Sequence, residues 1–241
     1  VNTYWPTPAG QVYSISWFDG FGRTWRTRNP GAVLNDGATM IDTETTHDVR
    51  GNVAATSLPH LTGDTAPQIV RTEYDWANRP VKIINADNAQ RTISYAVALS
   101  VAGAANVPLS LTTHTDELNR VRKTWTSTDG KVIRIDRQLG TGWQTENRIY
   151  DTLGRMTGVT DAGGAQWTNV YDMLGNRISA SDPDLGTWIY EHDLADQLTA
   201  QTDARGVRTT MSYDANGRLL QRSIAAPVVP DPVLVTNTYD Q

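Results

Sequence analysis

A tyrosine–aspartate pair followed by a glycine turn returns every 21 residues in the C-terminal half of this chain. The anchor positions are Tyr150-Asp151, Tyr171-Asp172, His192-Asp193 and Tyr213-Asp214. A fixed period of this length is typical of repeat proteins, in which each repeat is a small unit that packs against its neighbours. The period therefore favours an extended surface, wall or rod over a fold built around one pocket.

Each repeat holds two turn signals of the form Asp-x-x-Gly or a close relative. Asp suits the first position of a type I turn because its carboxylate accepts hydrogen bonds from nearby backbone N–H groups, and Gly suits the exit. The aspartates are 10 and 11 residues apart in alternation, which leaves about six or seven residues for each strand. The residues that define these turns are Asp151, Gly154, Asp161, Gly164, Asp172, Gly175, Asp182, Asp193, Asp203, Gly206, Asp214 and Gly217.

The segments between the turns alternate with a period of two. Residues 165–171 place Ala165, Trp167 and Tyr171 on one face, which is the signature of a strand. Each repeat is therefore predicted to be a β-hairpin, and successive hairpins to form a continuous, twisted, antiparallel sheet in an all-β fold.

The tyrosines and arginines of the repeat are predicted to be structural. A tyrosine ring can pack against the neighbouring repeat while its hydroxyl reaches a polar partner. Arginines recur where the chain leaves a turn, and we expect them to pair with turn carboxylates or to lie over tyrosine rings. These arginines are Arg23, Arg79, Arg120, Arg155, Arg177 and Arg218.

The run from Tyr150 through Met156, with Asp161 to Gly164 and then Tyr171-Asp172, resembles the YD repeat of the RHS family. Weaker copies begin at Phe18-Asp19, His47-Asp48, Tyr74-Asp75 and Thr115-Asp116. The family includes bacterial RHS polymorphic toxins, shell subunits of insecticidal toxin complexes and teneurins. The segment that closes the shell in that family, with its paired aspartates, has no match within these residues, and neither does a toxin domain.

The resemblance implies a structural segment of a larger secreted or cell-surface protein. In that family the repeats wind into a hollow β-shell, which encloses a toxin or presents another part of the same polypeptide. The partners implied are therefore the rest of the shell and an enclosed C-terminal domain. No autoproteolysis or toxicity is assigned to this chain.

Repeat regularity divides the chain into three predicted parts. Residues 1–73 are a divergent β region with degenerate repeats, 74–149 hold irregular YD-like repeats, and 150–241 hold regular repeats that end in a partial one. Because Tyr239-Asp240 matches the start of another repeat and the first residue is Val1, we expect a piece of a longer protein.

Composition narrows the classes of function. The formal net charge of −5 and the lack of a basic cluster with aromatic residues argue against nucleic-acid binding. The chain has no Cys, and it lacks an apolar stretch of about 18 residues that could span a membrane. A hydrophobic fraction of 39% would suit a thin wall with two partly wet faces.

No sequence motif indicates a cofactor, a metal site or a catalytic centre. The four histidines lack ligand spacing for zinc, and the repeated aspartates are better explained as turn caps than as calcium ligands. The chain is therefore predicted not to be an enzyme, and a hydrolase on a β scaffold is a weak third hypothesis. The main alternative is a module that binds carbohydrate or a cell-surface protein through exposed aromatics, with Trp143, Trp167 and Trp188 as candidates.

Overall fold

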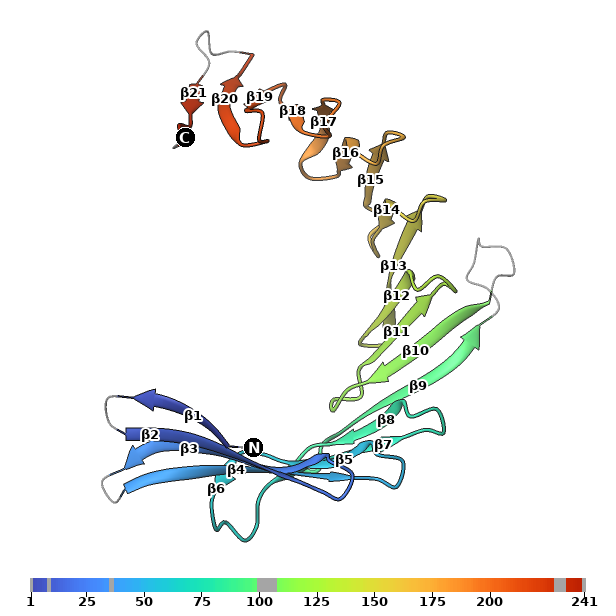
Figure 1. The fold of residues 1–241 in the computed structure, drawn as a ribbon. Helices are drawn as coiled ribbons and strands as arrows, with labels where there is room; N and C mark the ends of the chain where they lie inside the picture. The colour runs from blue at the N-terminus through green and yellow to red at the C-terminus, as the bar shows by residue number, and fades with distance from the viewer. Residues whose placement is uncertain (1, 8–9, 35–36, 99–107, 228–232, 240–241) are drawn as a thin grey trace. The chain divides into compact units, whose positions relative to one another are not determined.

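A computed structural model describes residues 2–7, 10–34, 37–98, 108–227 and 233–239. These residues form strands and turns, and no helix occurs among them, so the predicted all-β fold is confirmed (Figure 1). The chain divides into two compact units, Val1–Ala98 with Ser110–Lys123 and Leu99–Leu109 with Thr124–Gln241. The three-part division by repeat regularity stays a prediction.

The strands of the first unit and of the boundary between the units are β1 (Asn2–Thr7), β2 (Gly10–Phe18), β3 (Thr24–Leu34), β4 (Gly37–His47), β5 (Val53–Ser57), β6 (His60–Leu61), β7 (Ile69–Tyr74), β8 (Pro80–Ile84), β9 (Gln90–Ala98), β10 (Leu109–Thr115) and β11 (Val121–Thr126). Those of the second unit are β12 (Val132–Leu139), β13 (Gly142–Tyr150), β14 (Met156–Thr160), β15 (Gln166–Tyr171), β16 (Arg177–Asp182), β17 (Gly186–His192), β18 (Leu198–Thr202), β19 (Arg208–Tyr213), β20 (Leu219–Ala225) and β21 (Val233–Thr236).

The second unit is a ladder of antiparallel strands. Each strand from β12 to β20 pairs with the strand that follows it in the chain. Figure 1 shows these strands side by side in sequence order. Because consecutive strands run in opposite directions, their turns alternate between the two edges of the ladder. The turns at 151–154, 172–175, 193–196 and 214–217 therefore share one edge, which we call the YD edge.

A β-bulge follows every YD turn of the second unit. Tyr150 pairs with Met156, but the preceding residue Ile149 pairs with Gly158, so Thr157 is left over. The same shift occurs between β15 and β16, β17 and β18, and β19 and β20. Each shift inserts one extra residue into the strand after the turn and interrupts the regular backbone pairing there. The tyrosine side chain binds at this interruption.

The first unit repeats this hairpin geometry with longer strands. β2, β3, β4 and β5 pair in succession, β5 pairs with β7, and β7, β8 and β9 pair in succession. The short β6 pairs with β4. The side chain of Asp42 on β4 is fully buried, and its carboxylate accepts hydrogen bonds from Arg26, Arg28 (2.7 Å) and Thr62 (3.0 Å). These three donors compensate for removing the charge from water.

Few apolar side chains are buried. Among the described hydrophobic residues, Leu109, Ile135 and Ala200 are buried. Strands β15, β17 and β19 alternate between half-buried and exposed side chains along their length. Such alternation is expected of a ladder one strand-layer thick, and it accounts for a hydrophobic fraction of 39%.

Candidate functional site

The turn after Tyr150 shows how the Asp-x-x-Gly signal works. The N–H of Gly154 donates to the carbonyl of Asp151 at 3.0 Å, and the N–H of Asp151 donates to the carbonyl of Arg155 at 3.0 Å. The Asp151 carboxylate accepts the backbone N–H groups of Leu153 and Arg155 at 3.0 and 2.9 Å. The backbone bond from Arg155 is the main reason that the pKa of Asp151 lies below its usual range. The φ of Gly154 is +85°, where a side chain would be strained.

The degenerate copies in the first unit keep this turn. The first residue of each turn accepts a hydrogen bond from the backbone N–H of the residue four positions later. These first residues are Asp19, Asp48, Asp75 and Asp116. The fourth position, which needs a positive φ, is Asn in two of these turns, at Asn78 and Asn119, with φ of 60° and 58°. Asp196 takes the same position in the second unit at 60°. Asn and Asp tolerate this region better than other residues with a side chain.

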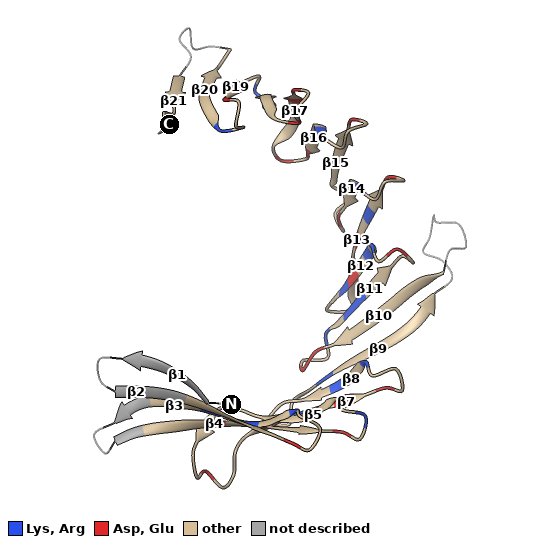
Figure 2. Cartoon of the chain, in the orientation of Figure 1, with Lys and Arg blue, Asp and Glu red and all other residues tan. Residues whose placement is uncertain are grey.

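The second set of turns lies at the opposite edge of the ladder. Asp161 and Asp203 cap their turns in the same way, each accepting the backbone N–H groups two and four residues onward. The loop at Asp182 has the same length, but its carboxylate accepts the backbone N–H groups of Asp184 and Leu185, and the positive φ falls at Gly186. Figure 2 shows acidic residues at turns on both edges, while the strands between them are mostly uncharged.

The anchor tyrosine reaches back to the preceding strand. The hydroxyl of Tyr171 donates to the carbonyl of Met156 at 3.1 Å, and that of Tyr213 donates to the carbonyl of Leu198 at 2.8 Å. Both acceptors lie just before the β-bulge, beyond the last residue pair between that strand and the strand carrying the tyrosine. The tyrosine therefore satisfies a backbone group that the ladder leaves unpaired.

The same bond recurs in both units, always to the residue five positions after the start of a turn. The hydroxyl–carbonyl pairs are Tyr74–Val53, Tyr95–Pro80, Tyr150–Val132, Tyr171–Met156, Tyr213–Leu198 and Tyr239–Leu219. The sequence predicted a packing role for this tyrosine but not its acceptor, because the bulge that frees the carbonyl has no sequence signature.

Three of the six predicted turn-exit arginines, Arg79, Arg155 and Arg218, join one repeat to the next. The Nε of Arg155 donates to the Asp151 carboxylate at 2.7 Å, its Nη1 donates to the carbonyl of Asp172 at 2.8 Å, and its guanidinium lies 4.9 Å from the Tyr171 ring centre. Arg79 and Arg218 likewise bind Asp75 and Asp214 while they stack on a tyrosine. Both expected roles, carboxylate pairing and ring stacking, are thus confirmed in single side chains.

The other three arginines make only part of this set of contacts or a variant of it. Arg120 pairs with Asp116, and Arg23 pairs with Asp19 while it stacks on Phe21. Arg177 lies one residue later in its turn, and it stacks on Tyr190 at 4.7 Å.

Asparagine replaces the arginine in two turns and joins repeats in another way. Asn176 donates to the Asp172 carboxylate at 3.3 Å and to the Asp196 carboxylate of the next YD turn at 2.8 Å. Asn52 donates to Asp48 at 2.9 Å and to the side chain of Asn78 at 3.0 Å. In both cases the acceptor is the positive-φ residue that replaces glycine in the next turn. Asparagine in place of arginine at one turn therefore pairs with Asn or Asp in place of glycine at the next.

His192 occupies the anchor position without the anchor bond. Its Nδ1 is buried and has no hydrogen-bond partner among the described residues. An imidazole is shorter than a phenol, so it does not extend to the carbonyl that a tyrosine would reach. The turn that follows His192 still has the repeat's geometry, because Asp193 accepts the backbone N–H groups of Ala195 and Gln197.

The three candidate tryptophans do not share one face. Cross-strand pairing places Trp167 opposite Val159, and Trp188 opposite Ala180, on the face that also carries Tyr171. Trp143 lies an odd number of residues before Tyr150, so its side chain projects from the other face, and it is 46% exposed. Trp167 and Trp188 therefore share one face of the ladder, and Trp143 lies apart from them.

A groove of about 630 Å³ lies on the Trp167 face. Val159 and Ala180 form its apolar floor beside Trp167, and its polar lining includes Asp182 and Asn169. The indole N–H of Trp167 donates to Asp182 at 2.9 Å, which fixes the ring. A hollow of about 590 Å³ lies farther along the same unit, around Tyr190 and His192.

The carboxylates of the groove are all engaged within the chain. Glu146 accepts hydrogen bonds from Arg137 (3.2 Å) and Arg148 (2.8 Å), and Asp161 and Asp182 cap turns. The described residues contain no cluster of three or more His, Cys, Asp or Glu that could hold a metal ion. No helix among them is long and apolar enough to cross a membrane.

Comparison with known proteins agrees with this geometry. The family model of the RHS repeat matches residues 150–187 and 192–226, where the turns are most regular. A search of curated proteins finds no match.

Solved structures share the fold. The chain is similar to the crystal structure of TcdB2-TccC3-TEV, with a TM-score of 0.69 and 17% identity over 95% of this chain. It is also similar to the crystal structure of TcdB2-TccC3, with a TM-score of 0.68 and 18% identity over 93% of this chain. A Photorhabdus luminescens Tc holotoxin pore matches with a TM-score of 0.68 and 17% identity over 93% of this chain.

In each case the chain spans 13% of the matched chain's length, and at these identities the likeness concerns the fold alone. The repeating turns and the shared fold agree with the family match, which places RHS repeats at residues 150–187 and 192–226.

Proposed function

We propose that the chain is a wall segment of a β-shell, within a larger secreted RHS-like protein that encloses or presents a toxin or other polypeptide of its own. The observation that carries this proposal is the chain of contacts from one repeat to the next, in which Asp151, Arg155, Tyr171 and Asp172 are joined in series. Such contacts hold successive hairpins in fixed order without a thick core. The fold shared with TcdB2-TccC3 supports the same reading.

The wall acts mechanically rather than catalytically in this proposal. Glu146, Asp161 and Asp182 line the groove, but each is committed to an ion pair or a turn. A carboxylate that serves as general acid or base must be free to exchange a proton with substrate. Their commitment to ion pairs and turns supports a structural role for the wall.

Limited proteolysis tests enclosure. The complete polypeptide encoded by the gene is digested before and after denaturation, and the fragments are identified by mass spectrometry. We expect one segment outside residues 1–241 to resist cleavage until the wall unfolds. Tyr171→Ala, which removes the ring and hydroxyl between two repeats, should allow earlier cleavage, whereas Val170→Ala, at an exposed position on the other face, should not. Equal cleavage of every segment in the native protein would contradict the proposal.

A second candidate function is carbohydrate binding, and the groove beside Trp167 favours it. Sugars stack on aromatic faces and accept hydrogen bonds from planar polar groups. Trp167 lines the groove together with Asn169 and Arg177, and Trp188 lies on the same face. The ligand class would be a neutral oligosaccharide on a cell surface.

A glycan array followed by variant binding tests this candidate. Trp167→Ala and Trp188→Ala should abolish a signal that Trp143→Ala, on the opposite face, retains. Absence of any signal, or equal loss with all three variants, would argue against a sugar site at this groove.

A further inference from the structure

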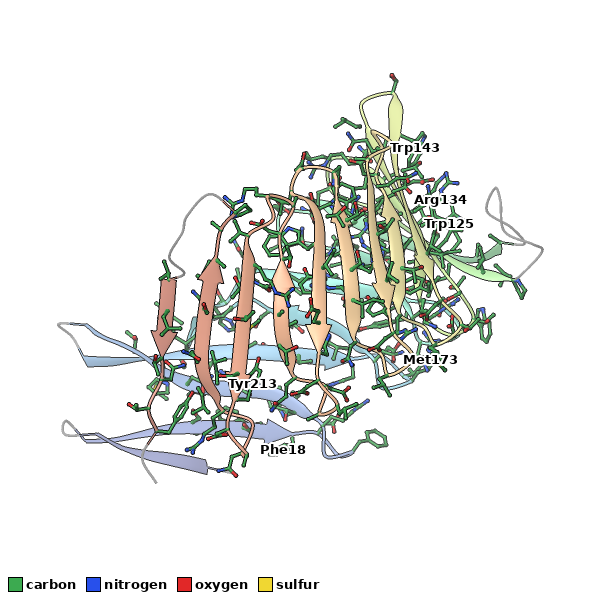
Figure 3. All side chains as sticks on the ribbon, turned by 90° about the horizontal axis from the view of Figure 1, so that it is seen from above. Phe18, Trp125, Arg134, Trp143, Met173 and Tyr213 are labelled. Atoms are coloured by element: carbon green, nitrogen blue, oxygen red, sulfur yellow. The ribbon has the colours of Figure 1, made fainter. Side chains whose placement is uncertain are left out.

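The hollow of about 590 Å³ in the second unit lies between two successive YD turns. Its polar lining comes from both turns and from the anchor position between them, and includes Asp172, Asn176, His192 and Asp193. Figure 3 shows Met173, in the first of these turns, toward the same ends of the strands as Tyr213 and away from Trp143. The hollow shares no lining residue with the larger groove on the Trp167 face, so the two are separate.

One repeat earlier, an arginine side chain occupies the equivalent place. The residues that match across the 21-residue period are Asp151 and Asp172, Arg155 and Asn176, Tyr171 and His192, and Asp172 and Asp193. Arg155 donates to the Asp151 carboxylate at 2.7 Å and to the carbonyl of Asp172 at 2.8 Å. Its guanidinium lies 4.9 Å from the ring centre of Tyr171. The groups that hold a guanidinium in one repeat therefore line the hollow in the next.

Two shorter side chains account for the hollow. Asn176 has no guanidinium, and it donates to the Asp172 carboxylate at 3.3 Å, a long hydrogen bond. The imidazole of His192 is shorter than the phenol of a tyrosine. Arg177 follows Asn176 but stacks on Tyr190 and lines the groove instead. No arginine or lysine is found among the described residues that line the hollow.

The hollow carries negative charge that the chain does not neutralise. Asp172, Glu191 and Asp193 contribute its carboxylates. Glu191 is paired with Arg208 at 2.6 Å. Asp172 and Asp193 form no ion pair within the described part of the chain, unlike the aspartates of the YD turns on either side. A concave site lined by unpaired carboxylates attracts a cation.

We propose that this hollow binds an alkylguanidinium group, carried by a small molecule or by an arginine residue of a peptide. The guanidinium would donate to the Asp172 carboxylate and to the carbonyl of Asp193, and it would stack on the ring of His192. A planar fork of N–H donors fits such a pair of acceptors, whereas an ammonium group is a point charge. The proposal does not rest on the wall function.

The Asp193 carbonyl can accept this donor although its own turn already uses it. The N–H of Asp196 donates to that carbonyl at 3.1 Å. One repeat earlier, the carbonyl of Asp172 accepts both the N–H of Gly175 at 3.3 Å and Arg155 at 2.8 Å. A carbonyl oxygen has two lone pairs, so the same double acceptance is available at the hollow.

Apolar side chains give the stem of the ligand a place to lie. Leu174, Ile178 and Leu194 line the hollow beside its carboxylates. Leu174 and Leu194 are 72% and 100% exposed, so their surfaces are open to a ligand. The methylene stem of an arginine can cover apolar surface while its charged end binds polar groups.

An NMR titration of the 241-residue chain with methylguanidinium and methylammonium tests the site. The two cations have the same charge, and we expect methylammonium to bind about tenfold more weakly because it lacks the planar fork. The backbone amide signals of Asn176 and Asp193 should shift on binding. The amide of Leu153 should not, because Arg155 already fills the equivalent place there. Equal binding of both cations, or equal shifts at every YD turn, would overturn the proposal.

A third probe distinguishes the two sources of the guanidinium group. N-acetyl-arginine methylamide carries the same charge as methylguanidinium and adds the methylene stem and a peptide backbone. Binding about fivefold tighter than that of methylguanidinium would assign the site to an arginine residue whose stem lies over Leu174 and Leu194. Equal binding would assign it to small guanidinium compounds. Either result requires that methylguanidinium binds more tightly than methylammonium.

Asn176→Arg provides a test that leaves every proposed acceptor in place. The new arginine should fill the hollow as Arg155 fills the equivalent place, so the affinity for methylguanidinium should fall about tenfold and the melting temperature should rise by about 2–4 °C. Asn176→Gln is the control, since it keeps an amide and adds no charge, and its affinity should stay close to that of the parent chain. Unchanged binding in Asn176→Arg, or a lower melting temperature, would refute the site.

Discussion

The anchor tyrosine stabilises the ladder at the point where its backbone pairing fails. After a YD turn the bulge leaves one carbonyl without a ladder partner, and wherever the next anchor is a tyrosine its hydroxyl donates to that carbonyl. A buried carbonyl without a partner costs free energy, whereas an ordinary hydrogen bond adds little net stability. The main contribution of the tyrosine hydroxyl is therefore to bind the carbonyl that the bulge after the turn leaves unpaired.

Tyr213→Phe isolates the contribution of this hydroxyl. The ring and its packing remain, but the carbonyl of Leu198 loses its donor at 2.8 Å. We expect the free energy of unfolding to fall by about 1 kcal/mol, measured by urea denaturation of the 241-residue chain. Tyr190→Phe is the control, because the Tyr190 hydroxyl accepts an exposed bond of 3.3 Å from Arg177. A larger effect at Tyr190 than at Tyr213 would contradict the account.

His192→Tyr should have the opposite sign. The buried Nδ1 of His192 has no partner among the described residues, and a tyrosine there would be placed to reach the carbonyl of Arg177, by analogy with Tyr171 and Met156. We expect a gain of about 1 kcal/mol in the free energy of unfolding. The reverse change, Tyr171→His, should cost a similar amount, and a destabilised His192→Tyr variant would refute the equivalence of the two sites.

Residue-level prediction succeeded where the interaction is local in sequence. Asp151 and Arg155 are four residues apart in one turn, so their pairing follows from the turn itself. The contacts of Tyr171 with Met156, and of Asn176 with Asp196, join different turns and depend on the register of neighbouring strands. That register is set by an unpaired residue such as Thr157, which has no distinctive side chain.

At the scale of the element, the hairpin turn depends on one backbone conformation. Gly164 has a φ of +85°, and a Cβ built on it would meet nothing within 4 Å. The neighbouring Gly163 is not among the residues of positive φ. Two adjacent glycines thus differ in the one property that makes glycine necessary.

Alanine at these two positions should change stability in opposite directions. Gly164→Ala forces a side chain into the left-handed region and should cost about 1–2 kcal/mol. Gly163→Ala reduces the freedom of the unfolded chain and should stabilise by roughly 0.4–1 kcal/mol. Thermal unfolding of both variants checks the pair, and equal shifts in one direction would contradict the turn assignment.

Strand parity explains why Trp143 lies apart from Trp167 and Trp188. Trp167 and Trp188 each precede their anchor residue by four positions, so they share the anchor's face. Trp143 precedes Tyr150 by seven positions and falls on the other face. This count was available in the sequence once the anchors were known. The extra residues of the bulges lie after the turns and not within β13, β15 or β17. Counting residues back from the anchor therefore gives the correct face in each of these strands.

At the scale of the molecule, contacts between adjacent repeats hold each unit together. Hydrogen bonds, ring stacking and ion pairs join each repeat mainly to the next one, and few side chains form a shared core. Stability in such arrays is close to a sum of local and nearest-neighbour contributions. The sequence could predict this all-β ladder from its period, because the period records the repeated local unit.

The repeated turn carboxylates make the whole array sensitive to acid. The pKa values of Asp75, Asp116, Asp151 and Asp214 all lie below the ordinary value of 3.8, first because a backbone N–H of the following arginine donates to each. A carboxyl with a lower pKa in the folded chain stabilises the fold fully above its unfolded pKa and loses that contribution as pH falls. We therefore expect stability to be constant from pH 7 to about 5 and to decline below about 4, measured by urea denaturation at each pH.

Substitution and salt distinguish this origin from general charge repulsion. Asp214→Asn keeps a side-chain acceptor for the backbone N–H but cannot ionise, so its stability should be lower at pH 7 and should fall less on acidification than that of the parent chain. Repulsion among cations at low pH would be relieved by salt, whereas the lost backbone hydrogen bonds would not. Two results together would assign the acid sensitivity to net charge and not to the turns. High salt would remove the decline below pH 4 entirely, and the stability of Asp214→Asn would fall with pH as steeply as that of the parent chain.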